Sequence, residues 1–278
     1  MHAGGLRAER REDLLSAPRS ARRLDAVTTG AAVLSQADVI GGWLDAAEPL
    51  LSRPTSLPGW SVGDLIGHLT QTLRTIATAL TQPVSGWPDP VPDYLGRLVA
   101  AAGQVRDREI DAGAGLSGAD RIASYRGLLG SARDAIDSVH PAAVVTAPRG
   151  RLRLGDFLAT RAVELVVHAD DIGRALPGHG PPIDPAALRV AVRLLADVLA
   201  SRRPGRAVEV RIPPHAAVQC IDGPRHTRGT PPGVVETTPI AWLRIATGRL
   251  AWSDAVATGA VTASGERTDL GDVLPVLR

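Results

Sequence analysis

Apolar residues recur at every third or fourth position through most of the chain up to residue 176. This spacing is typical of helices that each bury one face. The predicted helices cover residues 35–51, 61–76, 94–110, 117–139 and 154–176. Proline and glycine residues interrupt the pattern between them, so we expect these helices to form an up-and-down bundle.

The pattern changes after a proline- and glycine-rich stretch at 177–182, the clearest predicted linker in the chain. One more amphipathic helix is predicted at 185–201. Beyond it, apolar and polar residues alternate over short segments, as in half-buried strands. The expected strands are 207–213, 216–221, 233–237 and 260–264, and the expected short helices are 240–248 and 252–258.

The expected fold class is therefore α plus α+β, with a helix bundle at 33–176 and a small α+β domain at 183–278. Residues 1–32 are rich in arginine and lack a durable apolar period, so we expect them to be a disordered extension.

The composition is that of a soluble globular protein, with 44% hydrophobic and 22% charged residues. Net charge is only +2, and no arginine-rich stripe is interleaved with aromatic residues, which argues against nucleic-acid binding. No apolar run approaches the roughly 18 residues that a membrane helix needs. The arginine-rich N-terminal stretch has no hydrophobic region like that of a secretory signal, so we expect a cytoplasmic protein without a membrane partner.

The single cysteine, Cys220, excludes an internal disulfide framework. It lies in an alternating, strand-like segment, where a small buried side chain is the favoured interpretation over a nucleophile.

The helix predicted at 61–76 begins with a capping box, in which Ser61 caps the helix and Asp64 stands three residues later. Asp64 is therefore interpreted as a cap residue rather than a histidine partner. Trp60 is expected to pack at the entry to the helix. His68 falls on the same stripe as Leu65 and Leu69, so its imidazole faces the core.

A second candidate helix carries Glu164 and His168, four residues apart and hence on one face. With His68 they would supply two imidazole nitrogens and one carboxylate oxygen, which suit Zn²⁺ or a similar divalent ion. Spacing alone leaves a second interpretation open, because such pairs are common and a lone core histidine is usually just hydrogen-bonded. The zinc-protease pattern of two histidines flanking a glutamate on one helix is absent.

Two segments resemble the signatures of the mycothiol-dependent maleylpyruvate isomerase family, whose N-terminal domains are DinB-like four-helix bundles. They are LPGWSVGDLIGH at 57–68 and RAVELVVHADD at 161–171. The resemblance implies a 2-His-1-Glu site in which His68, Glu164 and His168 bind a divalent metal, zinc foremost. It also implies mycothiol as cofactor and a small electrophilic substrate, in an isomerase or a thiol transferase.

The last 90 or so residues resemble the sterol-carrier-like domain that is found fused to this family. The similarity rests on Trp242, Gly248-Arg249, Gly265 and Leu274-Pro275. An alternative function is therefore a module that binds a lipid or another small molecule, with a structural metal in the bundle. Arg249 is a candidate for holding a substrate carboxylate, a role that the resemblance itself does not assign to it.

Two charged neighbours of the candidate site are open to two interpretations each. Asp171 could accept the second N–H of His168, or it could be a solvated charge near the helix end. Arg161 could pair with Glu164 or Asp171, or it could form a surface ion pair of small value. No catalytic residue and no mycothiol-binding residue is assigned from the sequence.

Overall fold

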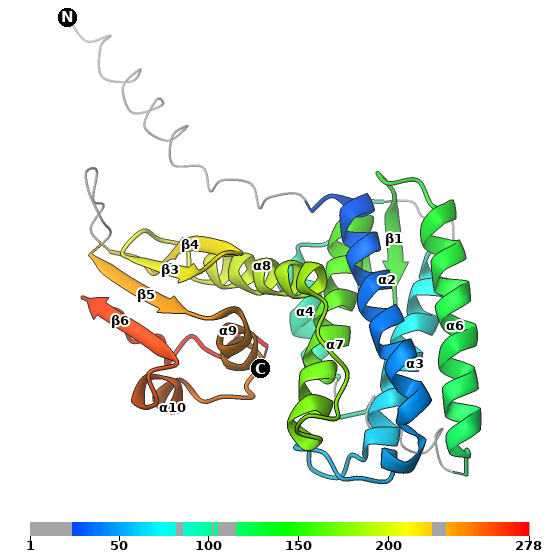
Figure 1. Ribbon diagram of the computed structural model, residues 1–278. Coiled ribbons are helices and arrows are strands. Elements are labelled where there is room, and N and C mark those ends of the chain that lie inside the picture. The colour runs from blue at the N-terminus through cyan, green and yellow to red at the C-terminus, as the bar shows by residue number, and fades with distance from the viewer. Residues whose placement is uncertain (1–23, 82–85, 102, 105–114, 224–231, 278) are drawn as a thin grey trace, which may run out of the picture.

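The computed structural model describes residues 24–81, 86–101, 103–104, 115–223 and 232–277, and all structural statements below concern these residues. Four long helices form an N-terminal bundle (Figure 1). They are α2 (Ala26–Trp43), α3 (Val62–Ala79), α6 (Gly118–Ser138) and α7 (Leu154–Ala175). Shorter elements join them: the 3₁₀ helices η1 (Leu44–Ala46) and η2 (Glu48–Leu50), helix α4 (Val91–Ala100), and an antiparallel hairpin of β1 (Val144–Ala147) and β2 (Gly150–Arg153).

The C-terminal part is a small α+β domain beside the bundle (Figure 1). Its elements are α8 (Pro185–Arg202), β3 (Val208–Ile212), β4 (Ala216–Cys220), β5 (Gly233–Thr237), α9 (Pro239–Ala246), α10 (Trp252–Ala257) and β6 (Val261–Gly265). The sheet order is β4-β3-β5-β6, in which only the β3–β5 pair is parallel. The predicted fold class, a helix bundle followed by a small α+β domain, is confirmed.

Helix α7 is the central element of the molecule. It packs against α2 and α3 of the bundle and also against α8, and most of its residues are buried. One cluster of buried apolar residues extends from the bundle helices through α8 to the sheet. Because the core is continuous across α7, side chains on this helix can contact both parts of the chain.

The segment 177–182 is attached to the bundle rather than hanging between two independent units. The indole Nε1 of Trp43 donates to the carbonyl of His179 at 2.7 Å, and Gln36 donates to the carbonyl of Pro182 at 3.1 Å. Gly180 also lies directly against the backbone of Gly173 in α7. The segment is therefore anchored to the bundle by hydrogen bonds, although most of its residues are exposed.

The expected extension at 1–32 is too long at its C-terminal end, because α2 begins at Ala26 rather than near Ser35. Asp25 caps this helix by accepting from Thr28 N. Small residues fill the first turns, so the apolar period there is weak even though the backbone is helical. Residues 1–23 lie outside the described part.

Two other sequence predictions need adjustment. The helix expected at 94–110 starts earlier, as α4 at Val91, and α4 ends at Ala100; most of the rest of the expected range lies outside the described residues. The hairpin of β1 and β2 was not predicted, because its strands are only four residues long. No helix in the described part is both long and apolar enough to cross a bilayer.

Candidate metal centre

The start of α3, the helix that carries His68, is fixed by local hydrogen bonds. The Ser61 hydroxyl accepts from Asp64 N at 3.1 Å, and Asp64 Oδ2 accepts from Ser61 N at 3.0 Å, which confirms the predicted capping box. The indole of Trp60 lies edge-on to the imidazole of His68, with 5.9 Å between ring centroids. Trp60 therefore contacts a candidate site residue as well as packing at the helix entry.

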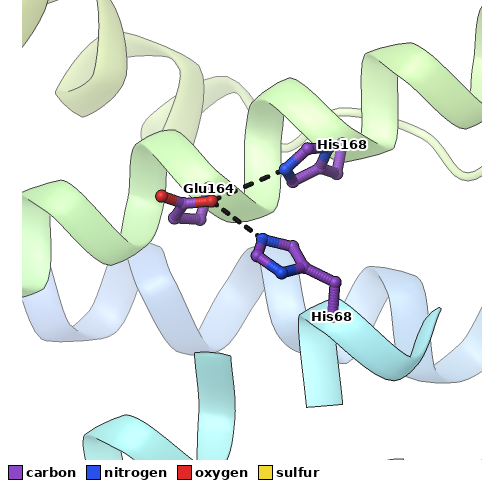
Figure 2. Close-up of side chains that lie close together, drawn as sticks. All are labelled: His68, Glu164 and His168. Atoms are coloured by element: carbon purple, nitrogen blue, oxygen red, sulfur yellow. Dashed lines mark hydrogen bonds and ion pairs between the residues drawn. The ribbon is translucent and has the colours of Figure 1, made fainter. Parts of the chain in front are cut away.

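Glu164 and His168 extend from the same face of α7 toward His68 on α3 (Figure 2). Nε2 of His68 is 3.0 Å from Glu164 Oε2, and Nε2 of His168 is 3.5 Å from the same oxygen. One ligand atom from each of the three residues lies within 4.8 Å of the other two. The structure thus brings together all three residues singled out in the sequence.

The separations fit a shared divalent ion. Ligands held about 2.1 Å from a tetrahedral zinc are about 3.4 Å apart, close to the two distances above. The three side chains are partly buried, with exposed fractions of 16% for His68, 19% for Glu164 and 12% for His168. If these three side chains held an ion, at least one coordination position would remain for another molecule, as in catalytic zinc sites.

Glu164 is ionised at neutral pH. Burial alone would raise its pKa, but hydrogen bonds from His168 and His68, with the positive charges of His68 and Arg161, hold the pKa well below its usual range. An ionised carboxylate is the form that binds a metal.

Asp171 contacts His168 from the side away from the three converging atoms. Its Oδ2 lies 3.0 Å from Nδ1 of His168, and its carboxylate is fully buried. Burial would raise the pKa of Asp171, but the hydrogen bonds from His168 and Arg249 lower it to about 2. The ionised Asp171 is an acceptor for Nδ1 of His168, and Nε2 of the same ring faces Glu164.

Arg161 does not form a surface ion pair, which was one of the two roles that the sequence left open for it. Its side chain is buried, Nε donates to Thr160 Oγ1 at 3.1 Å, and the guanidinium lies over the ring of Phe157. Within the described residues it forms no ion pair with Glu164 or Asp171, although its charge acts on Glu164. It provides a buried positive charge one turn before Glu164.

Arg249 is the site neighbour whose role the sequence left open. Its Nε and Nη2 bind Asp171 at 3.3 and 3.0 Å, and Nη1 donates to the carbonyl of Thr247 at 2.9 Å. Three of its five N–H groups therefore bind within the protein, two of them on Asp171, and the predicted role in holding a substrate carboxylate stays a prediction. Cys220 is buried in β4, and burial raises the pKa of its thiol to about 11, which agrees with a packing role.

The sequence matches two known protein families. The family described as the mycothiol maleylpyruvate isomerase N-terminal domain matches residues 35–173, half of the chain. The chain belongs to this family. Residues 184–276 match a second family, which is described as a bacterial SCP ortholog. The C-terminal domain of this chain is therefore sterol-carrier-like.

Solved structures share the fold of this family member. A crystal structure of the mycothiol-dependent maleylpyruvate isomerase matches at 16% identity with a TM-score of 0.56, covering 87% of this chain and 95% of that one. A histidine-to-alanine mutant of the mycothiol-dependent maleylpyruvate isomerase matches at 18% identity, with the same TM-score and coverage. No curated protein matches the chain significantly. At these identities the solved structures establish the fold alone.

Proposed function

We propose that this protein is a divalent-metal-dependent enzyme that uses mycothiol as its cofactor, in an isomerisation or in transfer of the thiol to an electrophile. The observation that carries the proposal is the convergence of His68, Glu164 and His168 from two helices onto one point. Family membership supports mycothiol as the thiol, and the donor set supports zinc as the metal.

A divalent ion held by these side chains would favour the thiolate form of a bound thiol. Three features of the site favour binding of such an ion. Asp171 lies against Nδ1 of His168, so Nε2 of the ring faces the other two side chains and would be the ligand atom. Glu164 is ionised without a metal, so its carboxylate needs no deprotonation on binding. Partial burial of all three residues removes water that would otherwise weaken their electrostatic interactions.

The chain's own thiol is not needed in this mechanism. Cys220 lies in β4 with a fully buried side chain and a raised pKa, so it is a poor nucleophile at neutral pH. The activated sulfur is therefore that of the small-molecule cofactor. Its electrophilic partner is a conjugated carbonyl compound for isomerisation, or an alkylating compound for transfer.

The test combines metal analysis with turnover. Purified protein should carry about one divalent ion, and His68→Ala and His168→Ala should lose most of it. The metal-loaded protein should consume maleylpyruvate or a panel of electrophiles only when mycothiol is present. Glutathione in place of mycothiol serves as the thiol control.

Cys220→Ser is the matched cysteine control, and it should keep full metal content and turnover. Loss of turnover in that variant would move the nucleophile to the protein and contradict the proposal. Tight binding of a lipid by the full chain, without thiol-dependent turnover, would favour the sterol-carrier-like alternative, in which the metal is structural.

A further inference from the structure

Two ion pairs of similar geometry join the C-terminal domain to α7. Asp170 and Asp171 are neighbours on α7, and both are buried. Arg244 of α9 binds Asp170 through Nε and Nη2 at 2.8 and 2.7 Å. Arg249, just after α9, binds Asp171 through the same two nitrogens at 3.3 and 3.0 Å. Each pair joins a carboxylate of the bundle to a guanidinium of the other domain.

Only one of these carboxylates contacts a residue of the candidate metal centre. Asp171 Oδ2 accepts from Arg249 and also lies 3.0 Å from His168 Nδ1. Arg249 is itself held in place, because Nη1 donates to the carbonyl of Thr247. A continuous chain of hydrogen bonds thus leads from the sterol-carrier-like domain to an imidazole whose other nitrogen faces Glu164.

We propose that Arg249 is a positioning residue for the metal centre, acting through Asp171 on the ring of His168. This inference rests on the proposed metal-binding function. A buried carboxylate can rotate about its terminal torsion, and two donors from a rigid guanidinium fix its plane. The fixed carboxylate then fixes the ring, so Nε2 points to the position shared with His68 and Glu164. Partners of ligand histidines typically change metal affinity 10- to 100-fold when removed.

The C-terminal domain therefore contributes to metal affinity through the contact of Arg249 with Asp171. The effect has an upper limit, because Arg174 on α7 lies 3.9 Å from Asp171 Oδ1 and retains part of the charge compensation when Arg249 is lost. We expect Arg249→Gln to weaken zinc binding about tenfold.

Arg244→Gln is the matched control. It removes an ion pair at the same interface with α7, but from a carboxylate, Asp170, that contacts no histidine of the centre. Zinc affinity is measured by competition with a chromophoric chelator, and we expect Arg244→Gln to change it by less than about threefold. The absorption spectrum of the Co²⁺-loaded protein should change in Arg249→Gln and stay like wild type in Arg244→Gln. A purely structural role in domain docking would not produce that difference.

A double-mutant cycle identifies the route. In an Asp171→Asn background, Arg249→Gln should have little further effect on zinc affinity, because the connection is already broken. Arg249→Lys restores the charge but not the two-donor geometry, so it should fall between wild type and Arg249→Gln.

Two outcomes separate this inference from the proposed function. Wild-type protein that binds neither zinc nor cobalt would overturn both. Wild-type binding with equal affinities and spectra for Arg249→Gln and Arg244→Gln would overturn the positioning role alone and leave the metal centre in place.

Discussion

Ser61→Ala tests how the start of α3 supports His68, because the chain contains a second capping box of the same kind. Ser117 caps α6, accepting from Asp120 N at 3.1 Å, as Ser61 accepts from Asp64 N at 3.1 Å. In both, the serine hydroxyl donates to the carboxylate at 2.6 Å. Helix α6 carries none of the three candidate ligands, so Ser117→Ala is a control for a lost cap.

The magnitudes follow from burial. Replacing an N-cap serine by alanine costs about 0.5–2 kcal/mol. Ser61 is half-buried and Ser117 is exposed, so we expect about 1–2 kcal/mol for Ser61→Ala and about 0.5–1 kcal/mol for Ser117→Ala. For a chain of this size, each kcal/mol lowers Tm by about 2–4 °C. Metal affinity can fall by no more than the lost cap free energy, about 30-fold at the upper end.

The assay is urea denaturation followed by circular dichroism, paired with zinc competition at fixed pH. Ser61→Ala should lose both stability and zinc affinity, while Ser117→Ala should lose stability and keep its affinity within about twofold. The reasoning is refuted by equal losses of zinc affinity in the two variants, or by an unchanged stability in Ser61→Ala.

Three further predictions concern the scaffold. Gly127 and Gly130 lie in α6, and a methyl group added at either would meet no atom within 4 Å. Gly127→Ala and Gly130→Ala should each raise the free energy of unfolding, measured by urea denaturation, by about 0.5–1 kcal/mol. Gly180→Ala should lower it by about 1–3 kcal/mol, because its Cβ would lie 2.4 Å from Cα of Gly173. Cys220, buried and with a pKa of about 11, should resist iodoacetamide at pH 8 until the protein is unfolded, since burial favours the neutral thiol; rapid labelling of the folded protein would contradict this.

The sequence predicted the elements whose signals are local. The cap at Ser61, the long apolar period of α7 and the alternation of β3 and β5 are all read from neighbouring residues. Helix α2 was placed too late because its first turns are small residues with little amphipathic contrast. The β1–β2 hairpin was missed because four-residue strands hold too few positions for an alternation to be recognised.

The candidate site was predicted residue by residue only through two motifs and a family resemblance. His68 and Glu164 are 96 residues apart, and no periodicity reveals that α3 and α7 face each other at these positions. The contact between Arg249 and Asp171 was missed for the same reason, since it joins two domains across 78 residues. The nearest local signal was a glycine that ends α9 just before an arginine.

The most direct measurement of the central claim is the absorption spectrum of the Co²⁺-substituted protein during titration with mycothiol. If His68, Glu164 and His168 hold an ion with an open coordination position, a sulfur-to-cobalt charge-transfer band should grow and saturate with the thiol. The band should persist in Cys220→Ser and vanish in His168→Ala. A wild-type protein that binds cobalt but shows no such band would contradict the assignment of this centre to thiol activation.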